Sequence, residues 1–327
     1  MLRRQVLALS LVTVASAACG SKKGAQKTTI AVIPKGTTHE FWKSVHAGGA
    51  KAAKELGVDI IWKGPLKEDD LKAQIDVVQS FIAQGVSGIV LAPLNDKGLT
   101  GAVKQAVEAK IPVVIFDSDL QGSDHKSFVA TDNFAAGKIA GEAMAKLLGD
   151  KGKVIVLRYQ EGSASTEKRE NGFLDAIKAH SGIEVVSSNQ YGGATTDSAS
   201  SASENLLSAK SAADGGVNGV FCPNESTTFG MLLALERVNL AGKMKFIGFD
   251  SSSKLVDALA AGKIDGLVLQ NPMNMGYLAV KTMASLLRGE KVESRIDTGA
   301  QLITKDNMNE PAQKALLSPD LKQWLGE

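Results

Sequence analysis

The sequence has few of the features that mark nucleic-acid-binding or disulfide-rich proteins. Basic and acidic residues nearly balance, at 37 and 35. Arg3 and Arg4 also fall in the N-terminal leader, so no nucleic-acid-binding surface is indicated. Cysteine occurs only at Cys19 and Cys222, which gives no disulfide framework. Aromatic residues make up only 5% of the 327-residue chain. Each aromatic beside a polar loop is therefore a candidate ligand contact.

Catalytic signatures are also lacking. The chain contains no GxSxG, GxxxxGK[ST] or HExxH motif and no clustered CxxC, so the common hydrolase, phosphate-loop and zinc-site patterns are missing. The histidines His39, His46, His125 and His180 show no metal-ligand spacing. Two strand-end aspartates, described below, could act as acid and base, but no nucleophile with an adjacent base can be argued. We expect a protein that is not an enzyme and uses no cofactor or metal.

The N-terminus predicts export. Residues 1–18 read as a signal peptide with a charged start, an apolar stretch over residues 6–14 and small residues before Cys19. The sequence SAAC resembles a bacterial lipobox, so we expect lipidation of Cys19 and a polar tether over residues 19–27. The protein would then be anchored to the membrane, in the periplasm or at the cell exterior. An ordinary signal peptide cut nearby is the alternative, and RRQVLA matches a twin-arginine signal only partly.

From residue 29 onward, short apolar runs alternate with helical periods. TIAVIP, VDIIW, SGIVLAP and IPVVIFD read as strands, with a helix over residues 40–56 after the first. A second alternation starts with a helix over residues 134–148 and ends with a helix over residues 273–287, followed by RIDTGAQLIT. This pattern is typical of βαβ crossovers and predicts an α/β protein with parallel sheets.

One strand and its polar end occur twice. PVVIFDSD at residues 112–119 and KFIGFDSS at residues 245–252 each place an aspartate, Asp117 or Asp250, directly after a buried strand. Ligands of parallel sheets bind outside the carboxyl ends of the strands. The duplication therefore predicts two similar lobes that enclose a small polar ligand between them.

The chain resembles the periplasmic sugar-binding proteins of the ribose/galactose type (type I), which are substrate-binding subunits of ABC importers. The resemblance covers residues 29 to about 304 and rests on segments in matching order: IAVIPKGTTHEFWKSVHAGGAKAAKELG, GVSGIVLAPLN, IPVVIFDSD, FVATDNFAAGKIAG, NESTTFGMLLAL, KFIGFD and LQNPMNMGY. It implies two Rossmann-like lobes joined by three hinge crossings. It places one lobe at residues 28–131 plus 271–298 and the other at residues 132–270 plus 299–327.

The resemblance also implies roles for individual residues. Phe41 and Trp42 match an aromatic pair that packs against the sugar ring, and Asp117 and Asp250 match acids that accept hydrogen bonds from sugar hydroxyls. The alternatives are structural: the aromatics could fill the core at a helix start, and the aspartates could cap helices.

Two amides complete the pattern. Asn224 and Gln270 match residues that exchange hydrogen bonds with the sugar, although Gln270 could instead serve a hinge. Four further candidate contacts depart from the ribose-binding type: Lys35, His39, Ser118 and Glu167.

These departures concern the identity of the ligand. Lys35 and His39 replace smaller polar residues, and a lysine facing the cleft resembles the branch that binds rhamnose or autoinducer-2. Ser118 and Glu167 replace arginines, whereas Arg169 keeps that residue type two positions later. A rhamnose-like or autoinducer-2-like ligand is therefore the alternative to a common monosaccharide. The other interpretation of Lys35 and His39 is a solvated loop.

Other functions remain as alternatives. The effector-binding core of a LacI-type repressor shares this fold, but it would need a DNA-binding motif where the export leader stands. A secreted enzyme or a sensory sugar receptor could use the same cleft. The expected partners are a small sugar, an ABC permease and, through the lipid, a membrane, with no nucleic acid and a monomeric chain.

Overall fold

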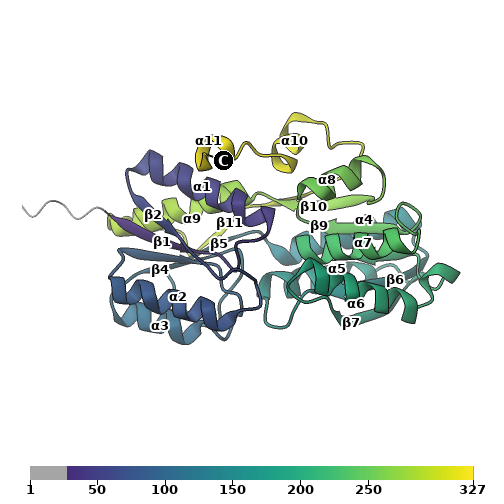
Figure 1. Ribbon diagram of the computed structural model, residues 1–327, viewed down its shortest axis with the longest axis horizontal. Helices are drawn as coiled ribbons and strands as arrows, with labels where there is room; N and C mark the ends of the chain where they lie inside the picture. The colour runs from purple at the N-terminus through teal and green to yellow at the C-terminus, as the bar shows by residue number, and fades with distance from the viewer. Residues whose placement is uncertain (1–27, 327) are drawn as a thin grey trace, which may run out of the picture.

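Residues 28–326 are described by the computed structural model of the chain, which contains two six-stranded sheets. The sheets lie beside each other along the long axis, and helices flank each of them (Figure 1). The predicted signal peptide, lipidated Cys19 and tether lie outside the described residues. Within the described part, no helix has the length and apolarity needed to cross a bilayer.

The first sheet has the order β11-β5-β4-β3-β1-β2, and all its neighbouring strands are parallel. Its central strands are buried on both faces, which explains their continuous apolar sequences. The elements of this half are the strands β1 (Thr29–Ile33), β2 (Asp59–Trp62), β3 (Gly88–Leu91), β4 (Val113–Phe116), β5 (Ser127–Ala130) and β11 (Arg295–Asp297), and the helices α1 (Glu40–Leu56), α2 (Leu71–Gln84), α3 (Thr100–Glu108) and α9 (Pro272–Leu287).

The second sheet has the order β12-β10-β9-β8-β6-β7 and is parallel except for β12, which runs antiparallel to β10. Its elements are the strands β6 (Gly152–Arg158), β7 (Ile183–Tyr191), β8 (Gly219–Phe221), β9 (Lys245–Phe249), β10 (Gly266–Gln270) and β12 (Ala300–Ile303), and the helices α4 (Asn133–Leu148), α5 (Ala164–Lys178), α6 (Thr196–Ala209), α7 (Glu225–Arg237) and α8 (Ser253–Ala260), with a short turn η1 (Ala212–Asp214).

The chain passes between the two halves at three places. It leaves the first sheet after β5, returns after β10, and crosses again between β11 and β12. The predicted fold of two lobes with parallel sheets and three crossings is confirmed. RIDTGAQLIT, which the sequence left undivided, supplies one edge strand to each sheet.

The C-terminal segment contacts both halves. Helix α10 (Pro311–Leu317) lies against β10, and α11 (Lys322–Leu325) lies against α1 of the first half (Figure 1). There, the ring of Trp324 lies 5.6 Å from Lys54 Nζ and 5.8 Å from Lys51 Nζ. Residues 299–327, which the sequence assigned to the second lobe, therefore contact that half through α10 and the first half through α11.

Glycines allow pairs of helices to cross closely in each half. On α1 and α9, a Cβ atom at Gly48 would lie 1.8 Å from the carbonyl oxygen of Met273, and one at Gly276 would lie 2.0 Å from that of Val45. The crossing of α4 and α5 repeats the arrangement, because Gly137 and Gly172 each meet a backbone oxygen at 2.1 Å. In each pair, a side chain would force the two backbones apart.

We predict that Gly276→Ala destabilises the protein by about 1–3 kcal/mol, because the added methyl group overfills the contact between α1 and α9. Gly101→Ala is the matched control. Gly101 lies in α3, where a Cβ atom meets nothing within 4 Å, so the change should be neutral or stabilise by up to about 1 kcal/mol. Chemical denaturation of the ligand-free variants measures both effects, and equal stabilities would contradict the proposed close contact.

Candidate functional site

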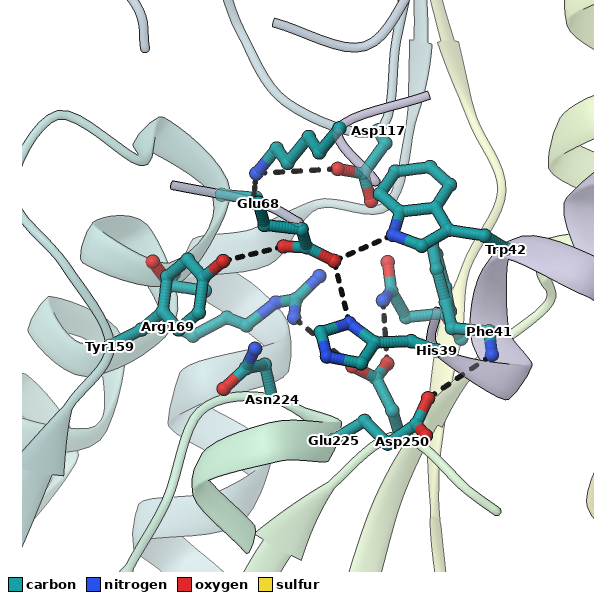
Figure 2. A pocket seen from close by; sticks show the side chains of 14 residues that line it. His39, Phe41, Trp42, Glu68, Asp117, Tyr159, Arg169, Asn224, Glu225 and Asp250 are labelled. Carbon is teal, nitrogen blue, oxygen red and sulfur yellow. Dashed lines mark hydrogen bonds and ion pairs between the residues drawn. The ribbon is translucent and has the colours of Figure 1, made fainter. Parts of the chain in front are cut away.

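A narrow cavity of about 30 Å³ lies where the strands of both sheets end. Side chains from both halves point into it (Figure 2). The lining residues are Lys35, His39, Phe41, Trp42, Glu68, Asp117, Tyr159, Ser165, Thr166, Arg169, Asn224, Glu225, Asp250 and Gln270. Among the described residues, no cluster of His, Cys, Asp or Glu could hold a metal ion.

Eight of the ten sequence-predicted contacts line this cavity, and Ser118 and Glu167 do not. Ser118 is fully buried beside it, where its hydroxyl accepts a hydrogen bond of 3.1 Å from the backbone N–H of Ser165. The carboxylate of Glu167, in the first turn of α5, accepts one of 2.6 Å from the backbone N–H of Gly162. Both residues therefore support the loops around the cavity.

The two duplicated aspartates have the same local structure. Asp117 follows β4 with φ +60°, and Asp250 follows β9 with φ +64°. In both cases the backbone N–H donates to a valine on the neighbouring strand, Val129 or Val268, at 3.0 Å. Aspartate tolerates this left-handed conformation better than most residues. The turn directs both carboxylates into one cavity from opposite sheets.

Cations compensate for the burial of these acids. Lys35 Nζ lies 3.5 Å from Asp117, and an Arg169 nitrogen lies 3.7 Å from Asp250. Burial raises the pKa of both carboxyls. At Asp117 this rise is opposed first by Lys35 and then by Arg169. At Asp250 it is opposed first by Arg169 and then by Gln270. Gln270 Nε2 also donates to Asp250 at 2.8 Å, while its buried Oε1 accepts nothing from the described residues.

Lys35 joins the two halves of the site. Its side chain is buried, and Nζ donates to Ser163 at 3.2 Å and to Ser165 at 3.0 Å, both on the second half. With Asp117 as the third partner, the three N–H donors of the ammonium are all occupied by protein groups. Lys35 therefore neutralises an acid and spans the cleft.

Glu68 is a site residue that the sequence did not reveal. Its carboxylate accepts hydrogen bonds of 2.6 Å from the Trp42 indole, the His39 imidazole and the Tyr159 hydroxyl (Figure 2). Burial alone would lower the pKa of His39, but the charge and hydrogen bond of Glu68 raise it to about 9. Burial would raise the pKa of Glu68, but His39, Lys35 and Tyr159 lower it to about 2.

Arg169, noted in the sequence only as a retained residue type, is held rigidly. Its Nε donates to Asn133 at 2.8 Å, its Nη1 donates to the carbonyl of Pro223 at 2.9 Å, and its guanidinium carbon lies 4.1 Å from the ring centroid of Phe249. Asn224 Oδ1 accepts hydrogen bonds from Thr227 as the N-cap of α7. Asn224 therefore caps α7 and also lies in the lining.

Aromatic rings form one wall of the cavity. Phe41 and Trp42 meet edge to face, with ring centroids 4.9 Å apart, and Trp42 meets Phe116 in the same way at 6.1 Å. This packing fixes an apolar surface opposite the charged groups. Both rings are also largely buried within a core cluster, as the structural alternative for them requires.

Two acids cross the cleft to reach helix N-termini. Glu225, at the start of α7, accepts hydrogen bonds from the backbone N–H groups of Glu40 at 3.3 Å and Phe41 at 3.1 Å. Glu40 accepts two hydrogen bonds of 2.9 Å from Ser253, at the start of α8. Negative groups are favoured at helix N-termini. Burial nevertheless raises the pKa of Glu225 to about 7, opposed by His39 and the backbone donors.

Comparison with known proteins identifies the class to which this fold and site belong. The periplasmic binding protein domain model matches residues 30–291, and the chain belongs to this family as a type I periplasmic sugar-binding protein. It is 30% identical to the ribose import binding protein RbsB of Haemophilus influenzae over 302 residues, 92% of this chain and 100% of the relative. The family makes it a binding component of ABC sugar transport rather than an enzyme.

Solved structures of similar proteins support the same family. A carbohydrate transporter solute-binding protein from Agrobacterium radiobacter, in complex with D-arabinose, has a TM-score of 0.85 and 35% identity and covers 90% of this chain and 100% of its own. An ABC transporter solute-binding protein from Agrobacterium vitis, with bound D-fucose, has a TM-score of 0.84 and 36% identity and covers 89% of this chain and 100% of its own.

We predict that Glu225 makes stability fall as the pH rises. Its pKa of about 7 in the folded protein exceeds the ordinary 4.5, so the folded state holds a proton that the unfolded state loses between these values. The wild type should therefore lose on the order of 1–3 kcal/mol relative to Glu225→Gln between pH 4.5 and 7.5. Denaturation at several pH values measures this difference. The exposed Glu108→Gln is the control, and parallel profiles for wild type and Glu225→Gln would contradict the prediction.

Proposed function

We propose that this protein is the substrate-binding lipoprotein of an ABC importer and captures a monosaccharide in the cleft between its lobes. The observation that carries this proposal is the convergence of Asp117 and Asp250, one from each sheet, on a single cavity with an aromatic wall. A sugar presents hydroxyl groups around its edge and C–H groups on its faces. Acceptors from two sides and a ring surface match that chemistry.

The remaining hydrogen-bonding capacity of the site also suits hydroxyl groups. Gln270 Oε1 can accept from a hydroxyl. A carboxylate has about four acceptor positions, so Asp117 and Asp250 can accept further hydrogen bonds beside their cations. The arabinose and fucose complexes of similar proteins support a pentose or hexose.

A rhamnose-like or autoinducer-2-like ligand gains no support from Lys35, because its donors are already used by Ser163, Ser165 and Asp117. We therefore favour a common monosaccharide. A sensory or chemotactic role would use the same cleft with a different partner. Loss of sugar uptake in a deletion strain would identify import, whereas intact uptake with lost chemotaxis would identify the sensory role.

We also propose that the lobes comprise residues 28–131 plus 271–298 and residues 132–270 plus 299–327, and that they close on the ligand as rigid units. The passages after β5, after β10 and between β11 and β12 would be the hinges. A ligand stabilises the closed form only through contacts that it makes better there. The cross-cleft partners of Lys35 and Glu225 would be made on closure.

We predict that Asp117→Ala and Asp250→Ala each weaken sugar binding about ten- to hundredfold, because a hydrogen bond to a charged group contributes about 1.5–3 kcal/mol. Mass spectrometry of ligand released from the purified protein, with D-ribose, D-arabinose and D-fucose as test ligands, selects the sugar. Calorimetry then measures the affinity. Asp76→Ala, on the outer face of α2, is the control and should bind as the wild type does. Wild-type affinity in both site variants would place the ligand elsewhere.

We predict that Cys19→Ser moves the protein from the membrane to the soluble fraction, because the substitution removes the thiol that would carry the lipid. Fractionation and mass spectrometry of the mature N-terminus measure this. Ser21→Ala keeps the thiol in the same tether and should stay with the membrane. A soluble, unlipidated wild type would refute the predicted lipid anchor, whereas the predicted signal peptide would still stand.

A further inference from the structure

We propose that Glu68 is the positioning residue of the cleft: its buried carboxylate orients Trp42, holds His39 as a charged donor, and receives Tyr159 from the opposite lobe. This inference rests on the proposed function, in which the cavity holds the ligand. Glu68 would act through its neighbours and need not touch the sugar.

The geometry places Glu68 at the junction of three side chains. The loop between β2 and α2 brings its carboxylate under the start of α1, where Oε1 accepts from Trp42 Nε1 and His39 Nδ1. Oε2 accepts from the Tyr159 hydroxyl, and all three distances are 2.6 Å. The residue is only 5% exposed. Such short bonds are typical of a charged acceptor.

His39 is the partner whose chemistry depends most on this carboxylate. Its Nδ1 hydrogen is directed to Glu68, and the ring lies between Glu68 and the part of the cavity formed by Asn224 and Asp250 (Figure 2). A neutral imidazole bonded in this way would present Nε2 as an acceptor, whereas an imidazolium presents an N–H donor. Glu68 therefore determines which of the two the ligand meets.

Other charges surround the pair. His39 faces Glu225 and Asp250 in addition to Glu68, and both favour the imidazolium. Glu68 faces Lys35 and the Tyr159 phenol in addition to His39, and both favour the carboxylate. Burial opposes the charged form of both residues. Without the charge of Glu68, burial still lowers the pKa of His39, and only the weaker effects of Glu225 and Asp250 oppose it.

Trp42 depends on Glu68 for the orientation of its ring. The indole N–H is a donor buried at the wall of the cavity, and Glu68 is its acceptor. The edge contacts with Phe41 and Phe116 restrict the ring but offer no acceptor. Without the carboxylate the indole would turn to find another partner, and the apolar wall would lose its fixed position.

Glu68 contacts the second lobe through both its side chain and its backbone carbonyl. The Tyr159 hydroxyl reaches the Glu68 carboxylate, and Gln160 Nε2 donates to the Glu68 carbonyl at 2.9 Å. Tyr159 is fully buried. Glu68 thus orients the aromatic wall and fixes the charge of His39 within the first lobe, and it accepts hydrogen bonds from the second lobe when the cleft is closed.

The test is the titration of His39 by NMR in ligand-free wild type and Glu68→Gln. Because His39 and Glu68 both belong to the first half, the wild-type imidazole should titrate well above the ordinary value of 6.5 and the variant near or below it, a shift of about two or more pH units. The indole N–H signal of Trp42 should move as well. An unchanged His39 titration in Glu68→Gln would overturn the proposal.

Three further variants separate charge from structure. Asp69→Asn removes the exposed neighbouring acid in the same loop and should leave the His39 titration as in the wild type. Glu68→Asp restores the charge and should restore a raised His39 titration, even if Glu68→Gln does not fold; failure to do so would count against the proposal. Tyr159→Phe removes only the side-chain contact of Glu68 to the second lobe, so it should weaken ligand binding without moving the His39 titration.

Ligand affinity provides an independent test of the role of Glu68. Whichever of D-ribose, D-arabinose and D-fucose binds, its affinity for Glu68→Gln should fall about tenfold or more relative to its affinity for the wild type as the pH rises from 6 to 8, and the titration of Glu225 is common to both proteins. Parallel pH profiles would contradict a role for Glu68 in fixing the charge of His39. If none of the sugars binds, the proposed function fails, and the ligand-free titration still decides the role of Glu68.

Discussion

Buried carboxylates at the centre of the molecule each need a positive partner, and most of the site's geometry follows from that requirement. Removing a charge from water costs several kcal/mol unless a counter-charge and hydrogen bonds compensate. One pair is 2.6 Å apart, whereas the two aspartate pairs are 3.5 and 3.7 Å apart. A carboxylate has about four acceptor positions, and Glu68 already accepts three hydrogen bonds, so the aspartates keep acceptor capacity that Glu68 has largely used. The pairs are Glu68–His39, Asp117–Lys35 and Asp250–Arg169.

The fold was predictable where a pattern repeats in the sequence. The alternation of apolar runs with helical periods predicted the parallel sheets, and the helix over residues 40–56 has those bounds in the structure. Asp117 and Asp250 were found because the ends of parallel strands share one edge. The split of RIDTGAQLIT into β11 and β12 was not predictable, because Gly299, at φ +72°, separates two short strands whose partners lie in different sheets.

The site was predictable only where side chains follow directly from a strand end. Glu68 lies in KEDD, a run of charged residues without periodicity, and only the folded loop shows which of the four is buried. Ser118 and Glu167 illustrate the opposite case, since they were chosen for their place in the sequence pattern. After Asp117 turns at φ +60°, the next side chain points to the backbone of Ser165. Neighbouring residues at such a turn face different ways.

The charge balance of the cavity favours an uncharged ligand. The three carboxylates discussed above have their three cations, which leaves Glu225 as the remaining acid in the lining. Its oxygens accept from two backbone N–H groups at the start of α1, and burial raises its pKa to about 7, which reduces its charge further. A charged ligand would have to displace one of these pairs and leave its partner buried alone. A polyhydroxyl ligand instead exchanges hydrogen bonds with them, so the same pairing selects against ions.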